Sequence, residues 1–231
     1  MFKTKLRKKY VVADSTLAVE LDKPDNYIFQ PGQYGSLLLE DVKEPTRDVR
    51  HTFSFASSPD KDTIRFVTRI RDSEYKKKLS DMNEESEVFL GLPGGFVIGE
   101  GYDGDKILFI VGGIGITPVL SYLESISSND VAISLLWSNK SNSTTPFYDE
   151  FTNGRYADER IDVTFVTTET QEGDIGGKRI DQEIINSFLE GHSKEWIYVF
   201  GSENFVDDIS SFLADSNISW ESVKSESFPG Y

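Results

Sequence analysis

The hydrophobic pattern of this 231-residue chain changes near residue 100, and this change limits its possible folds more than any other feature. Before it, short apolar or alternating runs are separated by turn residues, a pattern that predicts a closed antiparallel β-barrel or sandwich. After it, continuous apolar runs alternate with candidate helices, which predicts a parallel sheet covered on both faces. A polar, glycine-rich stretch at residues 99–105 joins the two parts. We therefore expect two domains, over residues 1–101 and 102–231.

Each part has its own set of expected elements. The first part contains candidate strands at residues 10–12, 16–21, 35–39, 52–56, 63–70 and 87–90, and a candidate helix at residues 74–79. The second contains candidate strands at residues 106–111, 131–137, 161–167 and 196–200, and candidate helices at residues 118–125, 147–151, 181–189 and 204–214. The predicted fold class is a six-stranded antiparallel β-barrel followed by a Rossmann-like parallel α/β domain. Ligands of such a pair are expected in the cleft between the domains, at the carboxyl ends of the parallel strands.

The composition removes several kinds of chemistry. The chain has no cysteine, which excludes disulfides, a Cys-held iron–sulfur cluster, Cys-ligated zinc and a cysteine nucleophile. Its two histidines, His51 and His192, are too few for a His-rich metal centre, so we expect no metal. Lys and Arg number 24 against 39 Asp and Glu, a net charge of −15 that repels nucleic acid. Without a long apolar run or an apolar segment behind the basic start, we expect a cytoplasmic protein with no membrane span.

The strongest local motif is Gly-Gly-Ile-Gly-Ile-Thr-Pro at residues 112–118. It follows an apolar strand and opens a helix, so its glycines would let the backbone approach a pyrophosphate closely. The free N–H groups at the start of the helix would stabilise the negative charge. Pro118 suits the first helical turn, where no N–H is needed. The motif predicts nucleotide binding, although a tight strand-to-helix turn without a ligand would also use such glycines.

Two further segments could bind anions or planar rings. Residues 50–59, Arg-His-Thr-Phe-Ser-Phe-Ala-Ser-Ser-Pro, place a cation, an aromatic ring and a hydroxyl at the end of a barrel strand. Residues 69–73 place Arg69 and Arg71 before a helix that Ser73 can cap, another arrangement that can hold an anion. Each segment also has a plainer interpretation, an amphipathic strand in the first case and a solvated basic strand end with a helix cap in the second.

Five motifs, taken in order, resemble those of the ferredoxin–NADP reductase-like superfamily of flavin reductases, and the resemblance covers nearly the whole chain. They are Phe-Gln-Pro-Gly-Gln-Tyr at 29–34, Phe-Ser at 53–54 with Ala-Ser-Ser-Pro at 56–59, Gly-Leu-Pro-Gly-Gly-Phe at 91–96, the glycine motif at 112–118, and Glu-Ser-Phe-Pro-Gly-Tyr at 226–231. The resemblance implies an FAD-dependent NAD(P)H oxidoreductase without an iron–sulfur domain. Its barrel would bind FAD and its α/β domain would bind NAD(P)H.

The resemblance also implies roles for individual residues. Phe53 would flank the isoalloxazine ring, and Ser54 would hydrogen-bond near its N5 atom. Ser73 and the neighbouring N–H groups would hold the FAD pyrophosphate. Glu203 would contact the carboxamide or the flavin edge, and Tyr231 would cover the ring unless the terminus is frayed. The candidate catalytic residues are thus Ser54, Glu203 and Tyr231, and the candidate cofactor-binding residues are Arg50, His51, Thr52, Phe53, Ser54, Thr68, Arg69, Ser73, Gly94, Gly95, Gly113, Gly115, Thr117, Ser138, Lys140 and Gly201.

Two departures from the superfamily pattern leave alternatives open. The family arginine stands two residues before the aromatic, where this chain has His51. Either a one-residue bulge restores Arg50 to the phosphate, or His51 replaces the arginine. The family's Cys-Gly-Pro is Phe-Gly-Ser at residues 200–202, so Phe200 could pack where the nicotinamide must enter. NADH and NADPH are both compatible with the strand end at residues 138–140, where Ser and Lys could meet a 2′-phosphate.

The electron acceptor is expected to be a separate molecule, because this chain has no cysteine to hold a cluster. A small redox protein such as ferredoxin or flavodoxin, a free flavin, a quinone or another small molecule would serve. An acidic redox protein would need a local basic patch, such as residues 3–9 or Arg71 with residues 76–78, although both could be solvated faces. One alternative is a nucleotide-binding or regulatory module of the same fold without efficient turnover. A weaker one is a carbohydrate- or protein-binding barrel attached to an α/β fold.

Overall fold

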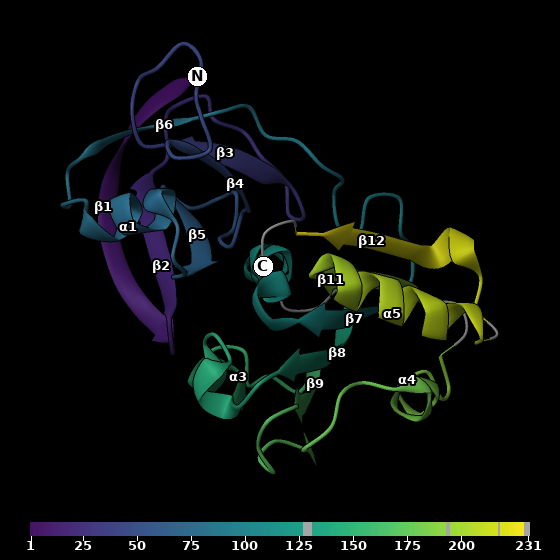
Figure 1. Cartoon of the computed structure of the whole chain (residues 1–231). Helices are drawn as coiled ribbons and strands as arrows, with labels where there is room; N and C mark the ends of the chain where they lie inside the picture. Colours follow the sequence, from purple (N-terminus) through teal and green to yellow (C-terminus); the bar gives the residue numbers. More distant parts are fainter. Residues whose placement is uncertain (127–130, 193–194, 217, 229–231) are drawn as a thin grey trace. The chain divides into compact units, whose positions relative to one another are not determined.

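The computed structural model describes residues 1–126, 131–192, 195–216 and 218–228, and the chain divides into two compact units (Figure 1). The first unit contains residues 1–100 and 117–126, and the second contains residues 101–116 and 127–231. Residues 117–126, which we expected in the second domain, therefore group with the first unit. None of the described helices has the length and apolar character needed to cross a membrane.

The first unit is built on a six-stranded antiparallel sheet with the strand order β4-β3-β6-β1-β2-β5. Its elements are β1 (Phe2–Ala13), β2 (Thr16–Asp22), β3 (Tyr34–Leu38), β4 (Arg50–Ser54), β5 (Thr63–Arg69), α1 (Glu74–Asp81) and β6 (Glu87–Leu90). The rings of Phe53 on β4 and Phe66 on β5 lie 5.6 Å apart, so side-chain packing brings the two end strands together. This arrangement agrees with the predicted six-stranded barrel.

Alternation along the strands explains the core of the first unit. One face of each strand turns apolar residues inward, and α1 adds Tyr75 and Leu79 from the same side of the helix. Ser73 begins α1 as predicted, because its hydroxyl accepts a hydrogen bond from the N–H of Lys76. The core members include Leu6, Val19, Leu21, Leu37, Phe53, Phe55, Ile64, Phe66, Tyr75 and Leu79.

The first strand begins earlier than its apolar residues predicted. It starts at Phe2 rather than near Tyr10, because its basic residues have acidic partners on the neighbouring chain segments. The pairs are Lys3–Glu87 at 2.5 Å, Lys5–Glu85 at 2.9 Å, and Arg7 with Asp22 at 2.7 Å and with Asp62 at 3.1 Å. The basic strip at residues 3–9 is therefore largely neutralised within its own unit.

The second unit is built on a six-stranded parallel sheet with the strand order β10-β9-β8-β7-β11-β12. Its strands are β7 (Lys106–Gly112), β8 (Ala132–Asn139), β9 (Ile161–Thr167), β10 (Ile175–Gly176), β11 (Trp196–Gly201) and β12 (Val223–Ser227). Its helices are α3 (Tyr148–Thr152), α4 (Gln182–Phe188) and α5 (Glu203–Ala214), with 3₁₀ turns at Gly113–Gly115, Asn142–Thr144 and Trp220–Ser222. The helix α2 (Ile116–Ser125), which follows the first of these turns, groups with the first unit from Thr117 onward. All six strands run parallel, as the alternating pattern predicted.

The interior strands of this sheet are the continuous apolar runs, while the two strands that the sequence did not predict lie at its edges. One face of the sheet packs under α4 and α5, with Leu108, Ile110, Leu136 and Val199 in the shared core. β10 has only two residues, and β12 is Val-Lys-Ser-Glu-Ser, whose polar residues suit a partly exposed edge. Edge strands need fewer buried apolar residues than central strands do, so their apolar pattern is weak and they are hard to predict from the sequence.

Candidate functional site

A polar face on β3 and β4 gathers several of the predicted cofactor-binding residues in the first unit. The two strands pair in one register, from Tyr34 opposite Ser54 to Leu38 opposite Arg50, without a bulge. Ser36, Thr52 and Arg50 are joined by hydrogen bonds, with Arg50 Nε donating to Ser36 Oγ at 3.2 Å and the two hydroxyls 3.2 Å apart. A cation and neighbouring hydroxyls are thus held together on one side of the sheet.

Ser54 lies on this same face at the end of β4. Its side chain is largely buried, and among the described residues its hydroxyl has no hydrogen-bond partner. The residue opposite is Tyr34, whose ring covers the turn at Gly94 and Gly95. A hydroxyl available beside an aromatic ring suits a planar heterocycle that carries a ring nitrogen.

Phe53 and His51 point to the opposite side of β4, where Phe53 is in the core and His51 is half-buried at its margin. The Phe53 ring lies 5.6 Å from Phe66 and 6.0 Å from Tyr75, and the His51 ring lies 4.3 Å from Tyr75. Burial, and next the charge of Lys76, lower the pKa of His51. The expected role of Phe53 beside the flavin ring stays a prediction, and the structure shows this ring packed against Phe66 and Tyr75. Of the two cations considered for a phosphate, Arg50 is the one on the polar face, and no bulge is needed to place it.

The glycines at 94 and 95 are explained by Tyr34. Gly94 and Tyr34 exchange backbone hydrogen bonds of 2.9 and 3.0 Å. Gly95 has a φ of +96°, and a Cβ there would lie 3.1 Å from the Tyr34 ring. Sequence analysis placed Tyr34 in a family motif but did not assign it a role. Its register opposite Ser54 shows that it borders the polar face.

The three remaining candidates of the first unit lie near the start of α1. Thr68 is buried in β5, and Arg69 is the partly exposed last residue of that strand. The Ser73 hydroxyl already caps the helix at 3.3 Å from the Lys76 nitrogen. Their contact with a pyrophosphate stays a prediction, in which the N–H groups of the helix start would contribute more than the Ser73 hydroxyl.

The glycine turn after β7 is a close-packed element of the second unit. A Cβ at Gly115 would clash with the backbone carbonyl of Phe200, and one at Gly112 would lie 2.9 Å from the Phe205 ring. Gly113 has a φ of +54°, and its carbonyl accepts a 3.0 Å hydrogen bond from the Trp137 indole. Backbone contacts of this kind admit only glycine, so packing alone explains these positions. Their role in binding a nucleotide remains compatible with that packing.

The position of Phe200, near the end of β11, bears on the suggestion that its ring could pack where a nicotinamide must enter. Its ring is fully buried and stacks between Phe109 and Phe228, with 6.4 Å between centroids in each case. Within the second unit, Phe200 is therefore a core residue rather than one that projects from the strand end. Gly201 accepts a 2.9 Å hydrogen bond from the Phe228 N–H, and Glu203 is exposed in the first turn of α5.

A second carboxyl, Glu226 on β12, was not selected from the sequence. It is in register with Phe200, and its Oε2 is buried with no hydrogen-bond partner among the described residues. Burial raises the pKa of Glu226 to about 7. The sequence signal was present, because Glu226 opens the motif at residues 226–231. Tyr231, the residue chosen from that motif, lies outside the described residues.

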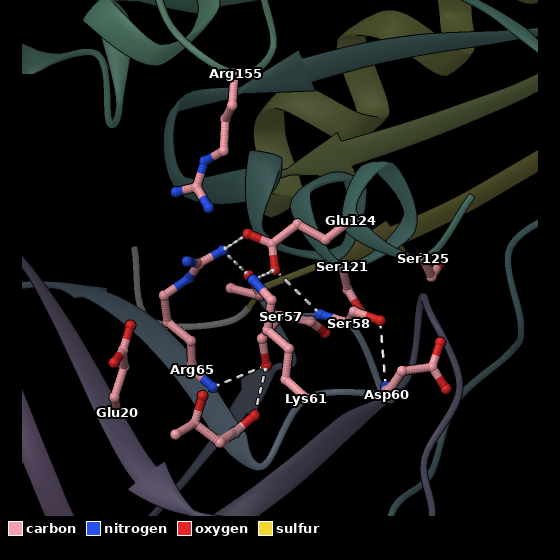
Figure 2. Close-up of polar contacts among 12 residues, drawn as sticks. Glu20, Ser57, Ser58, Asp60, Lys61, Arg65, Ser121, Glu124, Ser125 and Arg155 are labelled. Atoms are coloured by element: carbon pink, nitrogen blue, oxygen red, sulfur yellow. Dashed lines mark hydrogen bonds and ion pairs between the residues drawn. The ribbon is translucent and has the colours of Figure 1, made fainter. Parts of the chain in front are cut away.

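A buried ion-pair network in the first unit was also missed. Figure 2 shows Arg65 and Lys61 pointing toward the carboxylate of Glu124 on α2. Arg65 Nη2 lies 2.6 Å from Glu124 Oε1, and Lys61 Nζ lies 2.5 Å from Glu124 Oε2. The N–H of Ser58 donates to the same carboxylate at 3.2 Å. Burial alone would raise the pKa of Glu124, but the charges and hydrogen bonds of Arg65 and Lys61 lower it to about 2. This network holds α2, the helix that follows the glycine turn, in the first unit.

The comparisons with known proteins agree with this geometry. Residues 109–211, from β7 into α5, match the family model of the oxidoreductase NAD-binding domain. The structure is similar to a ferredoxin NADP⁺ reductase from Neisseria gonorrhoeae solved with bound FAD and NADP, with a TM-score of 0.82, 21% identity and 97% of each chain covered. The chain has the ferredoxin–NADP reductase-like fold. The predicted fold class is therefore confirmed, and the predicted resemblance is borne out at the level of the fold.

Curated relatives of this reductase-like chain include enzyme subunits. A glycine betaine monooxygenase reductase subunit from Pseudomonas aeruginosa is 33% identical over 109 residues, which are 46% of this chain and 29% of that protein. A probable dihydroorotate dehydrogenase B electron transfer subunit from Methanocaldococcus jannaschii is 23% identical over 212 residues, 92% of this chain and 74% of that protein. The chain thus spans less than a third of the first relative. Both relatives are thus subunits of oxidoreductases by name, which agrees with the oxidoreductase class predicted for this chain.

Within the reductase-like fold, each unit brings together its own share of the predicted residues. Arg50, Thr52 and Ser54 share one face of the first unit. Gly113, Gly115 and Gly201 lie at the carboxyl ends of neighbouring strands in the second. Ser138 lies inside β8 rather than after it, and Lys140 forms an ion pair with Glu169 at 2.8 Å. Thr117 is buried near the start of α2.

Proposed function

We propose that the chain is an FAD-dependent NAD(P)H oxidoreductase that transfers a hydride between a nicotinamide and a flavin and passes electrons to a separate acceptor. The observation that carries the proposal is that one chain contains both an antiparallel barrel and a parallel sheet. In the parallel sheet, the central strand β7 is followed by a glycine turn. That turn lies inside residues 109–211, the span that matches the oxidoreductase NAD-binding domain. The ferredoxin NADP⁺ reductase of the same fold was solved with FAD and NADP.

The polar face of β3 and β4 fits the groups of FAD. Arg50 supplies a charge for a phosphate, supported by the hydroxyls of Ser36 and Thr52. Ser54 offers a hydroxyl without a partner among the described residues, and Tyr34 offers an aromatic ring opposite it. FAD, when bound, supplies the redox chemistry, accepting a hydride and releasing electrons singly or in pairs. The side chains need only bind and orient it, which suits a chain with two histidines and no cysteine.

The carboxyl ends of the parallel strands fit a nicotinamide nucleotide. Gly113 and Gly115 can bring the backbone close to a pyrophosphate, and the free N–H groups of the 3₁₀ turn at Gly113–Gly115 can donate hydrogen bonds to it. Glu226, beside Phe200 in the register of β11 and β12, can hold a proton at Oε2 near neutral pH. We assign Glu226 the carboxyl role for which Glu203 was the sequence candidate, because Glu203 is exposed and Glu226 is partly buried.

We propose that the acceptor is a protein or small molecule that brings its own redox centre, as partner components would for a reductase subunit. This chain has no cysteine with which to hold a cluster. The basic residues suggested as a docking patch are mostly paired within the first unit, Lys77 with Asp72 at 2.6 Å and Lys78 with Glu40 at 3.1 Å. This pairing favours a neutral small molecule over an acidic redox protein. A cytoplasmic location is part of the same proposal.

The proposal is tested by reconstituting purified protein with FAD and assaying electron transfer from NADH and NADPH to an artificial acceptor. We expect FAD to bind and turnover to follow. Ser54→Ala should lower the turnover number by about tenfold while FAD still binds, because one hydrogen bond at the ring is removed. The matched control is Ser80→Ala, which removes an exposed hydroxyl at the end of α1. A protein that neither binds FAD nor oxidises either nucleotide would contradict the proposal and favour a binding module.

A further inference from the structure

The strand ends next to the glycine turn determine which pyridine nucleotide the second unit can hold. In parallel α/β sheets that bind dinucleotides, the pyrophosphate lies over the glycine turn of the first strand. The adenosine ribose lies at the carboxyl end of the next strand, where a carboxylate suits a free 2′-hydroxyl and a cation suits a 2′-phosphate. In this chain the next strand is β8, which ends at Asn139, and its outer neighbour is β9, which ends at Thr167.

The cation at this end is already neutralised. Lys140 Nζ lies 2.8 Å from Glu169 Oε1, and the backbone of the two strand ends continues to pair, with Thr168 N–H donating to Asn139 and Glu169 N–H donating to Lys140, both at 2.9 Å. This backbone pairing fixes Glu169 beside Lys140. The residues that sequence analysis offered to a 2′-phosphate are therefore accompanied by a carboxylate.

A second carboxylate lies beside the first. Glu172 Oε2 accepts hydrogen bonds from the Asn142 N–H and from the Thr170 hydroxyl, each at 3.2 Å. With Lys140 and Glu169, this gives the strand end one positive and two negative charges. A phosphate that carries about two negative charges would enter a negative environment there, with no surplus cation among these three residues.

The neutral groups at the same place suit a hydroxyl. The side chain of Asn139 is 6% exposed, and neither its Nδ2 nor its Oδ1 has a hydrogen-bond partner among the described residues. Asn142 Oδ1 is also buried without one. An amide donates and accepts hydrogen bonds, as a ribose hydroxyl does, and it carries no charge to balance a phosphate. This observation is independent of the carboxylates.

The charge of the whole second unit acts in the same direction. It contains 8 Lys and Arg against 21 Asp and Glu, a formal charge of −13. A field of that sign lowers the local concentration of anions, and it acts more strongly on the more highly charged nucleotide.

We infer that the nucleotide site takes the coenzyme with a free 2′-hydroxyl, NADH rather than NADPH, and that Glu169 is the specificity-determining residue. The inference rests on the proposed function for the location of the site. Glu169 selects by holding Lys140 and by repelling a 2′-phosphate, while Glu172 adds to the repulsion.

Binding without turnover tests this directly. Titration calorimetry compares ADP-ribose with its 2′-phosphate on the full chain, and we expect ADP-ribose to bind at least about tenfold more tightly. Equal or tighter binding of the 2′-phosphate would overturn the inference. Binding of neither compound would contradict the nucleotide site of the proposed function itself, so the two failures are distinguishable.

Substitutions at the two ends of β9 identify the residue responsible. Glu169→Gln should tighten binding of the 2′-phosphate by about three- to fivefold and leave ADP-ribose within about twofold, because Lys140 is released. Glu169→Arg should remove the preference for ADP-ribose. The matched control is Glu159→Gln, which removes the same charge from the same unit at the amino end of β9. An equal effect of Glu159→Gln would assign the preference to the overall field and overturn the role of Glu169.

Discussion

The two units differ in their net charge and in where their cations lie, although both are expected to bind dinucleotides. The first unit has 16 Lys and Arg against 18 Asp and Glu, a formal charge of −2, and the second carries −13. In the first unit, basic residues on β1 pair with acids on neighbouring segments, and Arg50 remains on a polar face. The second unit instead presents backbone N–H groups and glycines.

This difference indicates two ways of holding a pyrophosphate. In the first unit, a side-chain cation, Arg50, would add to the N–H groups at the start of α1. In the second unit, a pyrophosphate would meet only backbone groups, and the glycines at residues 112–115 would allow that close approach. The comparison predicts that charge substitutions act most in the first unit and that steric substitutions act most at the glycine turn of the second.

The largest effect is expected from the buried network of the first unit. Glu124→Gln should lower the free energy of unfolding by about 3 kcal/mol, because Arg65 would keep its charge in a buried place with its counter-ion removed. Glu87→Gln, which breaks the exposed pair with Lys3, should cost about 0.5 kcal/mol. Chemical denaturation measures both, and hydrogen exchange reports whether α2 is released. If the two substitutions lowered the free energy of unfolding equally, the buried pair would stabilise the fold no more than the exposed pair does.

The same network gives a pH dependence. The pKa of Glu124 is lowered from 4.5 to about 2, so the folded state favours the ionised carboxylate. Its stabilisation is present above about pH 4.5 and is lost as the pH falls toward 2. The acid limb of the stability curve should therefore be shallower in Glu124→Gln than in the parent chain. Parallel acid limbs would contradict this assignment.

The next largest effect is expected at the glycine turn. Gly115→Ala places a Cβ against the Phe200 carbonyl, so the turn must shift. We expect reduction by NADH to slow by about a hundredfold, because a displacement of this kind misaligns the reacting groups. FAD content, which we propose to depend on the first unit, should stay unchanged and serves as the internal control. If Gly115→Ala lowered the FAD content as well as the rate of reduction by NADH, FAD binding would depend on the glycine turn too, and this assignment would be contradicted.

A smaller effect is expected from the cation of the polar face. Arg50→Gln should weaken FAD binding by about ten- to a hundredfold, the range of a lost charge-assisted hydrogen bond. His51→Gln should change FAD affinity by less than about twofold, because the half-buried His51 ring packs against Tyr75 on the other side of β4 from Arg50. Fluorescence titration with FAD measures both. A stronger effect of His51→Gln would restore the histidine as the phosphate ligand.

The smallest effect is expected from Glu226. Its pKa is raised from 4.5 to about 7, so the folded state holds the proton longer than the unfolded state. Stability should therefore fall as the pH rises from about 4.5 through 7, by about 1 kcal/mol after allowance for partial exposure. Glu226→Gln should remove this slope, and the exposed Glu221→Gln should keep it. Thermal unfolding across this pH range provides the measurement.

The sequence predicted the fold well because periodicity and turn residues decide it locally. The central strands and α1 follow from apolar runs and the Ser73 cap, and β12 was missed because an edge strand can be polar. The candidate site depends on more than local sequence. The motif alone does not show on which face of β4 each residue lies, and the register of β3 and β4 turns Phe53 inward and Arg50 out. Glu124 and Arg65 are 59 residues apart, and only the folded chain brings them together.

The central claim is that the first unit holds FAD and the second delivers a hydride to it from NADH. Anaerobic titration of the FAD-loaded chain with NADH, followed by flavin absorbance, tests this claim most directly. We predict that the flavin band bleaches with one NADH per FAD, and that NADPH requires a higher concentration. A flavin band that stays unchanged with excess NADH and NADPH, in a chain shown to bind both FAD and ADP-ribose, would contradict it.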